Sequence, residues 1–449
     1  MSPVTFKPLL ASRPLRWADY KTLMLSALGA MLEIYDFVIF VFLMNELSEL
    51  FFPANMPQWV AQLQMIGIFA AGFLVRPLSG IVIAHFSDKL GRKRMFALSL
   101  FLMAVPTLCI GLLPTYATLG ILAPLLLLLL RIMQGIAIGG EVPSAWVFVA
   151  EHIPPNRMGL GLGLLTCGIS GGSLLGALVL IGLKSHFNEA QIHEFAWRLP
   201  FLLGGVFGLV SVYMRRFLSE TPVFKEIAAK RQLSREFPLK TVLRDHLPAS
   251  TLAFVMTWTT ASVVIIVILL LPGQLQAQLG LPKSAIFQAN ALATIMMVAG
   301  NISLGWLSDR LGTRSTYLFC WTGILISGYY FFTQMGPGMT LQQLTVNYMF
   351  MGYFAGVTVT MPTVSVRAFP AAVRVTGVSF AYNIAFALSS LLTPVAVNVW
   401  SRHDPLAPAH YLAILAICSI IMGFTPLAQR GYQSARQSVP SARSITSIL

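Results

Sequence analysis

Long apolar stretches recur along the chain and leave few positions for polar surface. Two of them, 113-LPTYATLGILAPLLLLLL-130 and 252-LAFVMTWTTASVVIIVILLL-271, have the length of roughly 20 residues that a helix needs to cross a bilayer. Charged residues make up 10% of the 449 residues, against about 25% in soluble domains. Because a soluble protein of this size needs a charged surface that this composition cannot supply, the sequence predicts an integral membrane protein.

Charged or Pro/Gly-containing breaks divide the apolar sequence into twelve predicted membrane spans. Their approximate limits are 22–47, 59–86, 95–115, 118–150, 158–183, 197–214, 248–277, 284–307, 315–335, 341–367, 373–400 and 408–428. The predicted fold class is therefore an all-α membrane protein with twelve transmembrane helices.

Lysine and arginine concentrate in alternate loops between these spans. Most of the 30 lie in the amino-terminal segment, the loops near 88–94, 157, 215–244, 310–314 and 367–374, and the carboxyl tail. The opposite loops hold Lys184, Arg198, Lys283 and Arg402. Because positively charged loops are retained on the cytoplasmic side, this pattern predicts that both termini are cytoplasmic. It also accounts for the net charge of +14 without a nucleic-acid partner.

A short charged segment occurs once in each half of the chain, as 85-HFSDKLGRKR-94 and again as 306-WLSDRLGTR-314. Each copy follows the second span of a group of six, which predicts two pseudo-symmetric six-helix bundles. The long polar segment after span six separates them. The predicted organisation is a bundle over 1–214, a cytoplasmic linker over 215–246, a second bundle over 247–429 and a disordered cytoplasmic tail over 430–449.

These segments resemble the signature loop of the major facilitator superfamily, G-x-x-x-D-[RK]-x-G-[RK]-[RK]. The second copy fits it from Gly305 to Arg314, whereas the first has Ala84 in place of the opening glycine. The chain further resembles the metabolite:proton symporter family, which includes citrate, 2-oxoglutarate, shikimate and proline/betaine transporters. The matching segments are 29-GAMLEIYDF-37, 76-RPLSG-80, 131-RIMQGIAIGGEVPSAWVFVAEHIPPNR-157, 220-ETPVF-224 and 369-FPAAVRVTGVSFAYN-383.

The resemblance implies a monomeric, proton-coupled secondary transporter of the bacterial inner membrane that works by alternating access and needs no cofactor. Enzyme chemistry is not expected, because no Ser-His-Asp arrangement, His/Cys metal-ligand spacing or phosphate-binding GxxxxGK[ST] loop is found. Four cysteines are scattered without CxxC spacing, so neither a metal site nor a disulfide framework is predicted. Import is favoured over export, because 168-GISGGSLLG-176 lacks the proline common in exporters of the superfamily and reads as a helix-packing segment.

Charged side chains inside the spans mark candidate functional residues, because a charge in hydrocarbon is costly unless it faces a cavity or a partner. Glu33 and Asp36 lie three residues apart in span one, and Arg131, Gln134 and Glu141 share one face of span four. Asp36 and Arg131 match the aspartate–arginine pair of proton-coupled sugar transporters of the superfamily. The resemblance implies that Asp36 carries the proton, with Glu33 as the alternative carrier and Glu141 as a more distant one.

The substrate follows less directly from the sequence. Arg76 and Arg131 favour a small carboxylate, because guanidinium matches carboxylate geometry. A zwitterion such as proline or betaine is the alternative, and a larger carboxylate derivative stays open. The candidate substrate-binding residues are Arg131, Gln134, Glu141, Tyr35, Arg76, Trp258, Tyr353, Tyr382 and Asn383.

The repeated charged segments are also candidate gates. We expect Asp88 and Arg92, together with Glu151 as the family resemblance implies, to form a cytoplasmic charge cluster that holds the outward-open state. An acid at a helix amino terminus is favoured by about 0.3–1 kcal/mol, so Asp88 is expected to cap span eleven near Arg374. Asp309 with Arg314 is expected to act in the same way against span five.

Overall fold

The computed structural model describes residues 12–229, 238–279, 282–336, 338–425 and 428, and the predicted tail over 430–449 lies outside them. The described residues form helices and no strand, so the all-α prediction is confirmed. The helices of the first half are α1 (Trp17–Phe42), α2 (Met44–Phe51), α3 (Gln58–Leu90), α4 (Arg92–Leu112), α5 (Tyr116–Leu119), α6 (Leu122–His152), α7 (Met158–His186), α8 (Glu189–Gln191) and α9 (Arg198–Arg215). Two short helices, α10 (Pro222–Ala229) and α11 (Pro238–Asp245), lie between the halves. Those of the second half are α12 (Leu247–Val264), α13 (Leu271–Leu279), α14 (Lys283–Leu311), α15 (Thr313–Gln334), α16 (Leu341–Ala355), α17 (Thr360–Ala368), α18 (Arg374–Ser401) and α19 (Ala407–Phe424).

Ten helical segments of the described residues are long and apolar enough to cross a membrane. The segment Glu189–Ala196 with α9, bent by 44°, makes an eleventh. The remaining predicted span, the ninth (315–335), corresponds to α15, which has 22 residues and thus sufficient length, but also many Ser, Thr and Tyr side chains that lower its hydropathy.

Two predicted spans are less regular than expected. Span one, predicted over 22–47, is two helices, because the chain departs from helical geometry at Leu43 between α1 and α2. Span seven continues from α12 through a π-helical segment, Ile265–Leu270, into α13. Such widened turns often lie where a helix must adjust to its neighbours.

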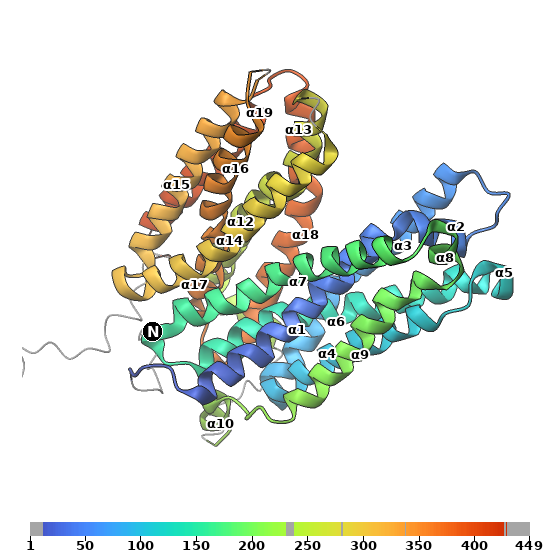
Figure 1. Cartoon of the computed structure of the whole chain (residues 1–449). Helices are drawn as coiled ribbons and strands as arrows, with labels where there is room; N and C mark the ends of the chain where they lie inside the picture. Colours follow the sequence, from blue (N-terminus) through green and yellow to red (C-terminus); the bar gives the residue numbers. More distant parts are fainter. Residues whose placement is uncertain (1–11, 230–237, 280–281, 337, 426–427, 429–449) are drawn as a thin grey trace, which may run out of the picture.

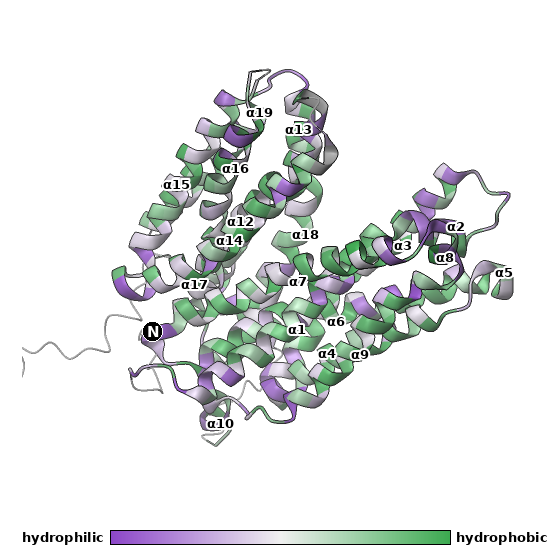
Figure 2. Ribbon diagram, in the orientation of Figure 1, coloured by the Kyte–Doolittle hydropathy of each residue, from purple (hydrophilic) through white to green (hydrophobic). Residues whose placement is uncertain are grey.

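The helices form two bundles that meet at one end and separate at the other (Figure 1). In the first bundle α3 packs on α6, α1 on α7 and α4 on α9; in the second α14 packs on α16, α12 on α18 and α15 on α19. Two equivalent seams join the bundles, α3 against α18 and α7 against α14. Hydrophobic residues cover the outer faces of both bundles (Figure 2), as expected of surfaces that contact lipid.

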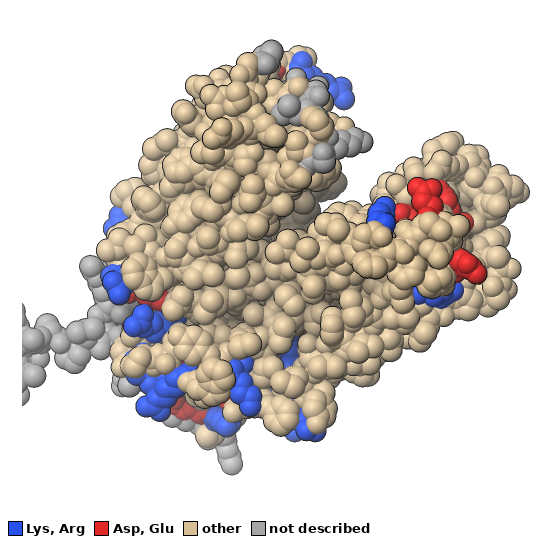
Figure 3. Space-filling view, in the orientation of Figure 1, with Lys and Arg blue, Asp and Glu red and all other residues tan. Residues whose placement is uncertain are grey.

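Lysine and arginine side chains gather at the end where the bundles meet, and a deep cleft separates the bundles at the opposite end (Figure 3). We call the first of these the basic end. It contains the two repeated segments, each of which turns at a glycine with positive φ, Gly91 at 114° and Gly312 at 93°. A side chain would be strained at either position, which explains why both copies of the segment have glycine there.

Glycines also allow the close helix contacts that the sequence predicts. A Cβ atom at Gly168 would lie 2.7 Å from the carbonyl oxygen of Ala27 on α1, and one at Gly172 would overlap the backbone of the same helix at Met31. Gly135 of α6 approaches the backbone of Gly72 on α3 in the same way. The predicted packing role of these small residues is confirmed.

Candidate functional site

A carboxylate and an arginine meet in the middle of the first bundle. Arg131 Nη1 of α6 lies 3.3 Å from Asp36 Oδ2 of α1, and both side chains are buried. Gln134 Nε2 donates to the same carboxylate oxygen at 2.8 Å, and Thr107 Oγ1 of α4 donates to Asp36 Oδ1 at 2.8 Å. The ring of Phe40 covers the guanidinium at 4.1 Å. Three predicted residues are thus brought together, and their charges are compensated inside the bundle.

Glu141 belongs to a second buried cluster, nearer the basic end. Arg215 Nη2, at the end of α9, lies 2.6 Å from Glu141 Oε1, and Ser99 of α4 donates to Glu141 Oε2. The Arg215 guanidinium lies over the ring of Phe96 at 3.5 Å. A Cβ atom at Gly29 would collide with Arg215 and lie 3.0 Å from Glu141 Oε1, so glycine leaves room for the pair. The polar face of α6 therefore supplies two separate clusters.

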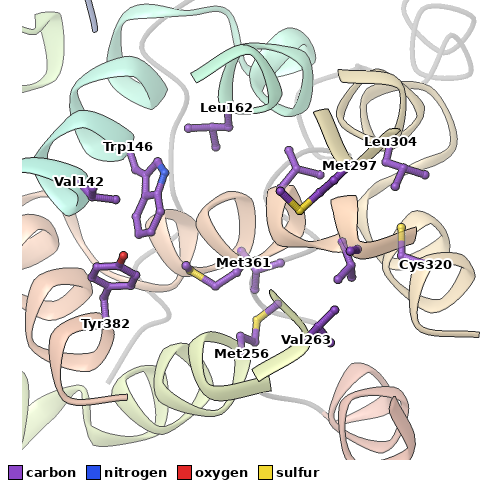
Figure 4. Close-up of a cluster of buried hydrophobic side chains, with 14 of the residues drawn as sticks. Val142, Trp146, Leu162, Met256, Val263, Met297, Leu304, Cys320, Met361 and Tyr382 are labelled. Carbon is purple, nitrogen blue, oxygen red and sulfur yellow. The ribbon is translucent and has the colours of Figure 1, made fainter. Parts of the chain in front are cut away.

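A third group lies where the bundles face each other, and we call it the interface site: Glu33, Arg76, Trp146, Tyr382 and Phe386. The Arg76 guanidinium of α3 lies 5.0 Å from the Phe386 ring of α18, and Arg76 also hydrogen-bonds Tyr382. Trp146 of α6 meets Tyr382 edge to face, with ring centroids 4.9 Å apart (Figure 4). This site combines an arginine with aromatic rings contributed by both bundles.

Glu33 completes the interface site with a negative charge. It is buried on α1, and the charged groups near it are Arg76 and Arg215 of opposite sign and Glu141 and Asp36 of the same sign. Its Oε2 atom has no hydrogen-bond partner among the described residues. A buried carboxylate oxygen without a partner is costly, so Glu33 is suited to receive a donor or a cation from a ligand.

Apolar side chains pack beside this site where the bundles face each other. Met361 of α17 lies between Leu162 of α7 on one side and Met256 of α12 on the other (Figure 4). Flexible methionine side chains adapt to neighbours of varying shape. These residues form an apolar layer between the two bundles.

Asp88 joins the two bundles at the basic end. Its Oδ2 atom accepts hydrogen bonds from the backbone N–H and the hydroxyl of Thr376, both at 2.9 Å, and its Oδ1 atom accepts one from the Val375 N–H at 3.4 Å. These groups belong to the first turn of α18, whose unpaired N–H groups favour a carboxylate. Asp88 therefore lies at the position where the sequence predicts a cap on span eleven.

A charge network surrounds this cap. Glu151, near the end of α6, lies 3.1 Å from Arg92 Nε and 2.6 Å from Arg374 Nη1, and all three side chains are buried. Arg92 Nη2 also donates to the carbonyl oxygen of Ala371, at 2.7 Å. Since Arg374 and Ala371 belong to the second bundle, both contacts cross between bundles.

The segment after α9 hydrogen-bonds to the same network. Glu220 Oε1 accepts hydrogen bonds from the backbone N–H groups of Arg92 and Lys93, both at 3.2 Å, and so caps α4. Thr221 Oγ1 donates to Glu151 Oε2 at 2.8 Å. The 220-ETPVF-224 segment, noted in the sequence only as a matching motif, thus contacts the first repeated segment directly.

The second repeated segment makes the equivalent cap at the other seam. Asp309 Oδ1 accepts from the Gly159 N–H at 2.7 Å, and Oδ2 accepts from the Leu160 N–H at 2.8 Å, both in the first turn of α7. Arg314 does not form the predicted pair with Asp309. Its guanidinium lies 4.8 Å from the Phe424 ring of α19 instead. Arg367 of α17 lies on this side instead and donates to Thr313 Oγ1 at 3.0 Å.

The structure places the four other predicted residues outside the interface site. Three of them take part in packing within a bundle, and the fourth joins the two bundles. The Tyr35 hydroxyl donates to the carbonyl oxygen of Pro200 at 2.8 Å, in the packing of α1 on α9. Tyr353 hydrogen-bonds Ser303 at 2.9 Å between α16 and α14, and Trp258 packs on Phe254 one turn earlier in α12. Asn383 Nδ2 donates to the Gly139 carbonyl oxygen at 2.7 Å and links α18 to α6. None of these contacts places the four side chains against Glu33.

The sequence did not single out several residues that the structure places at these sites. They are Thr107, Trp146, Arg215, Thr221, Thr313, Arg367 and Phe386. Arg215 and Arg367 fell at predicted span ends, where arginine usually anchors a loop. Internal comparison of the two repeats could have drawn attention to Thr313, since arginine stands at the equivalent position 92.

Comparison with known proteins agrees with this arrangement. The chain is 29% identical over 441 residues to the proline/betaine transporter of Salmonella typhimurium (strain LT2), covering 95% of this chain and 86% of that protein. It is 31% identical over 412 residues to the inner membrane metabolite transport protein YhjE of Escherichia coli (strain K12), covering 89% and 92%. Its fold matches the solved structure of the proton:xylose symporter XylE bound to 6-bromo-6-deoxy-D-glucose, with a TM-score of 0.74 at 14% identity over 90% of this chain and 94% of that one. The Major Facilitator Superfamily description matches residues 23–394. The chain belongs to the Major Facilitator Superfamily and is a multi-pass membrane transporter rather than an enzyme.

Proposed function

We propose that this protein is a proton-coupled symporter that imports a small zwitterionic solute across the bacterial inner membrane. The observation that carries the proposal is the presence of both charges at the interface site: the buried Glu33, whose Oε2 atom has no hydrogen-bond partner among the described residues, and Arg76 beside the ring of Phe386. A zwitterion presents both charges within a few ångströms, so its carboxylate and its cationic group can be bound at once.

Each half of a zwitterion has a suitable group in this site. The Arg76 guanidinium offers a planar set of donors that suits a carboxylate. Quaternary ammonium groups bind well over aromatic faces, which Trp146, Tyr382 and Phe386 supply. The Glu33 carboxylate adds a negative charge near the cation and disfavours a second anionic group on the substrate.

The position of Arg131 explains why we favour a zwitterion over the carboxylate that the sequence suggested. The sequence counted Arg76 and Arg131 as two possible anion ligands. In the structure Arg131 is engaged by Asp36 and Gln134 and is covered by Phe40. With a single arginine at the interface site and Glu33 beside it, a di- or tricarboxylate lacks sufficient positive charge. The likeness to proline/betaine transporters supports the same preference.

Coupling to protons is assigned to Asp36. Helix α6 carries both Trp146 of the interface site and Arg131, so a shift of α6 when substrate binds would leave the Asp36 carboxylate less well compensated and favour its protonation. A neutral Asp36 lowers the cost of enclosing the site away from water. Substrate and proton then bind with reciprocal positive linkage.

Alternating access requires two bodies that move relative to each other, and an orientation of the protein in the membrane. We assign the moving bodies to residues 1–214 and 247–429, joined by the linker 215–246, with both termini in the cytoplasm. The positive charge of the basic end supports a cytoplasmic location. In that orientation the cleft in Figure 3 faces outward.

The test uses purified protein in proteoliposomes with an inwardly directed proton gradient. Uptake of labelled glycine betaine and proline is compared with that of citrate and 2-oxoglutarate. We expect gradient-driven uptake of a zwitterion, abolished by a protonophore. Glu33→Gln is expected to weaken betaine binding, and Arg76→Lys to weaken both substrate classes. Uptake of the carboxylates with no response to any zwitterion would contradict the proposal.

A further inference from the structure

The two repeated segments occupy equivalent positions but differ in charge at one of them. Each contains an Asp-[Lys/Arg]-Leu-Gly sequence, followed by Arg92 in the first copy and by Thr313 in the second. The facing helices also correspond. Glu151 stands three residues before Pro154, and Arg367 stands three residues before Pro370.

The equivalent residues touch each other in both halves. Arg92 Nε lies 3.1 Å from Glu151 Oε2, and Thr313 Oγ1 lies 3.0 Å from Arg367 Nη1. The contact is therefore retained, while its chemistry changes from an ion pair to a hydrogen bond between a hydroxyl and a cation. A hydrogen bond to a neutral hydroxyl is weaker than one between two charged groups.

This difference between the two pairs affects how strongly each seam holds the bundles together. At the α3/α18 seam three side chains of the first bundle contact the second: Asp88 caps α18, Arg92 donates to Ala371, and Glu151 pairs with Arg374. The acid–base pairs of this seam are buried and mutually compensated. Removing either partner would leave an unpaired buried charge.

At the α7/α14 seam the polar side-chain contacts across the bundles are fewer, although the two helices themselves pack more extensively than α3 and α18. Asp309 caps α7 through Gly159 and Leu160. The hydrogen bond of Arg367 stays within the second bundle, because Thr313 belongs to that bundle as well. Without an acid at position 367, no counterpart of the Glu151–Arg374 pair exists across this seam in the described residues.

From these contacts we propose that the α7/α14 seam parts first when the basic end opens, and that Thr313 and Arg367 set this order. The inference rests on alternating access as proposed above. It assigns these two residues a role that neither cap explains: they keep one seam weak, so that release of substrate toward the basic end begins there. The α3/α18 seam then acts as the last contact to break.

The experiment measures both seams with matched spin-label pairs. Arg310 and Asn156 flank the α7/α14 seam, and Lys89 and Ala372 are their counterparts at the α3/α18 seam. Each pair is labelled after the four native cysteines are replaced by serine, and distances are measured with and without glycine betaine at low pH. In the wild-type background we expect the Arg310/Asn156 distances to lengthen under conditions in which the Lys89/Ala372 distances stay short.

Two variants are expected to change the open fraction of the α7/α14 seam in opposite directions. Thr313→Arg alone places two cations together beside Asp309, and we expect their competition for the Asp309 carboxylate to weaken its cap on α7 and to raise the open fraction of the α7/α14 seam by roughly tenfold, the factor that the loss of one hydrogen bond to a charged group can supply. Thr313→Arg combined with Arg367→Glu copies the first seam, and we expect it to lower that fraction below wild type. If Thr313→Arg does not fold, Glu151→Gln tests the same order, because it should open the Lys89/Ala372 pair.

Several outcomes would overturn the inference. Equal lengthening of both pairs in the wild-type background, or earlier lengthening of Lys89/Ala372, contradicts the proposed order while leaving alternating access intact. The same shift in the single and the double variant contradicts the role of Thr313 and Arg367. Failure of both pairs to move would overturn alternating access and this inference together.

Discussion

Arg131 Nη1 lies 3.3 Å from Asp36 Oδ2 across the contact of α1 with α6, and the rest of the first bundle shields both groups from water. Two charges in such surroundings depend on each other, since removal of one leaves the other without compensation. A proton on Asp36 would have the same effect as removal of its charge. This dependence makes the pair the most suitable place for coupling.

We therefore predict that Asp36→Asn abolishes accumulation driven by a pH gradient and leaves substrate exchange across the membrane measurable. The amide retains a hydrogen-bonding group toward Thr107 and Gln134 but cannot carry the proton. Uptake and counterflow assays in proteoliposomes measure the two activities separately. Asp245→Asn is the matched control, because Asp245 pairs with Arg244 at the surface. If Asp36→Asn still accumulates substrate in response to pH, Glu33 becomes the coupling candidate.

The charged candidates in the first bundle show how far sequence reasoning reaches. Asp36, Arg131 and Gln134 could be grouped from the sequence, because a charge inside an apolar span needs a partner and helical spacing limits where it lies. The same reasoning put Glu141 on their face of α6. It could not show that Arg215 enters from the end of α9 and draws Glu141 into a separate cluster.

Aromatic residues were harder to assign. Tyr35 and Tyr382 have the same chemistry and both lie in predicted spans, yet the first bonds Pro200 in helix packing and the second faces Trp146 between the bundles. Only the rotation of each helix in its bundle distinguishes them, and a uniformly apolar span has little periodicity to fix that rotation. The gates were easier, because the Asp88 and Asp309 copies reveal the symmetry and each acid needs a helix terminus to cap.

The aromatic wall of the interface site provides the second prediction. Tyr382→Leu is expected to weaken binding of glycine betaine by about 2- to 30-fold, the range that corresponds to the loss of a cation–π contact of about 0.5–2 kcal/mol. Isothermal titration of the purified protein measures this change. Tyr330→Leu is the control, because Tyr330 lies exposed on the outside of the second bundle. Equal affinities in all three proteins would exclude Tyr382 from the substrate site.

The third prediction concerns the cap on α18. Asp88→Asn weakens three hydrogen bonds to Val375 and Thr376 by removing the negative charge from their acceptor, so the basic end should open more often. A cysteine at position 361, in the apolar layer of Figure 4, should then react roughly tenfold faster with a membrane-impermeant maleimide added from the basic side. Native cysteines are replaced beforehand.

The same reporter tests the second cap through Asp309→Asn, which is also expected to increase labelling. Lys93→Gln is a suitable control, because the Lys93 side chain contacts the Arg216 carbonyl oxygen within the first bundle and does not cross a seam. Unchanged labelling in both aspartate variants would leave the repeated segments with a role in topology alone.

The last prediction concerns stability and the pair formed by Glu141 and Arg215. Both side chains are 1% exposed, and their charged atoms are 2.6 Å apart. Glu141→Gln leaves the Arg215 charge buried without a counter-ion and is expected to destabilise the protein by about 3–5 kcal/mol. Thermal unfolding in detergent, followed by tryptophan fluorescence, should show a clear fall in the midpoint temperature. Glu46→Gln removes an acid that pairs with the exposed Lys184, and a surface pair of this kind contributes about 0–1 kcal/mol, so its midpoint should change little. Replacing both partners, by Glu141→Gln with Arg215→Met, removes the unpaired charge and should recover a large part of the loss. A double variant as unstable as Glu141→Gln would mean that packing around Gly29 and Phe96, rather than charge compensation, makes this cluster necessary.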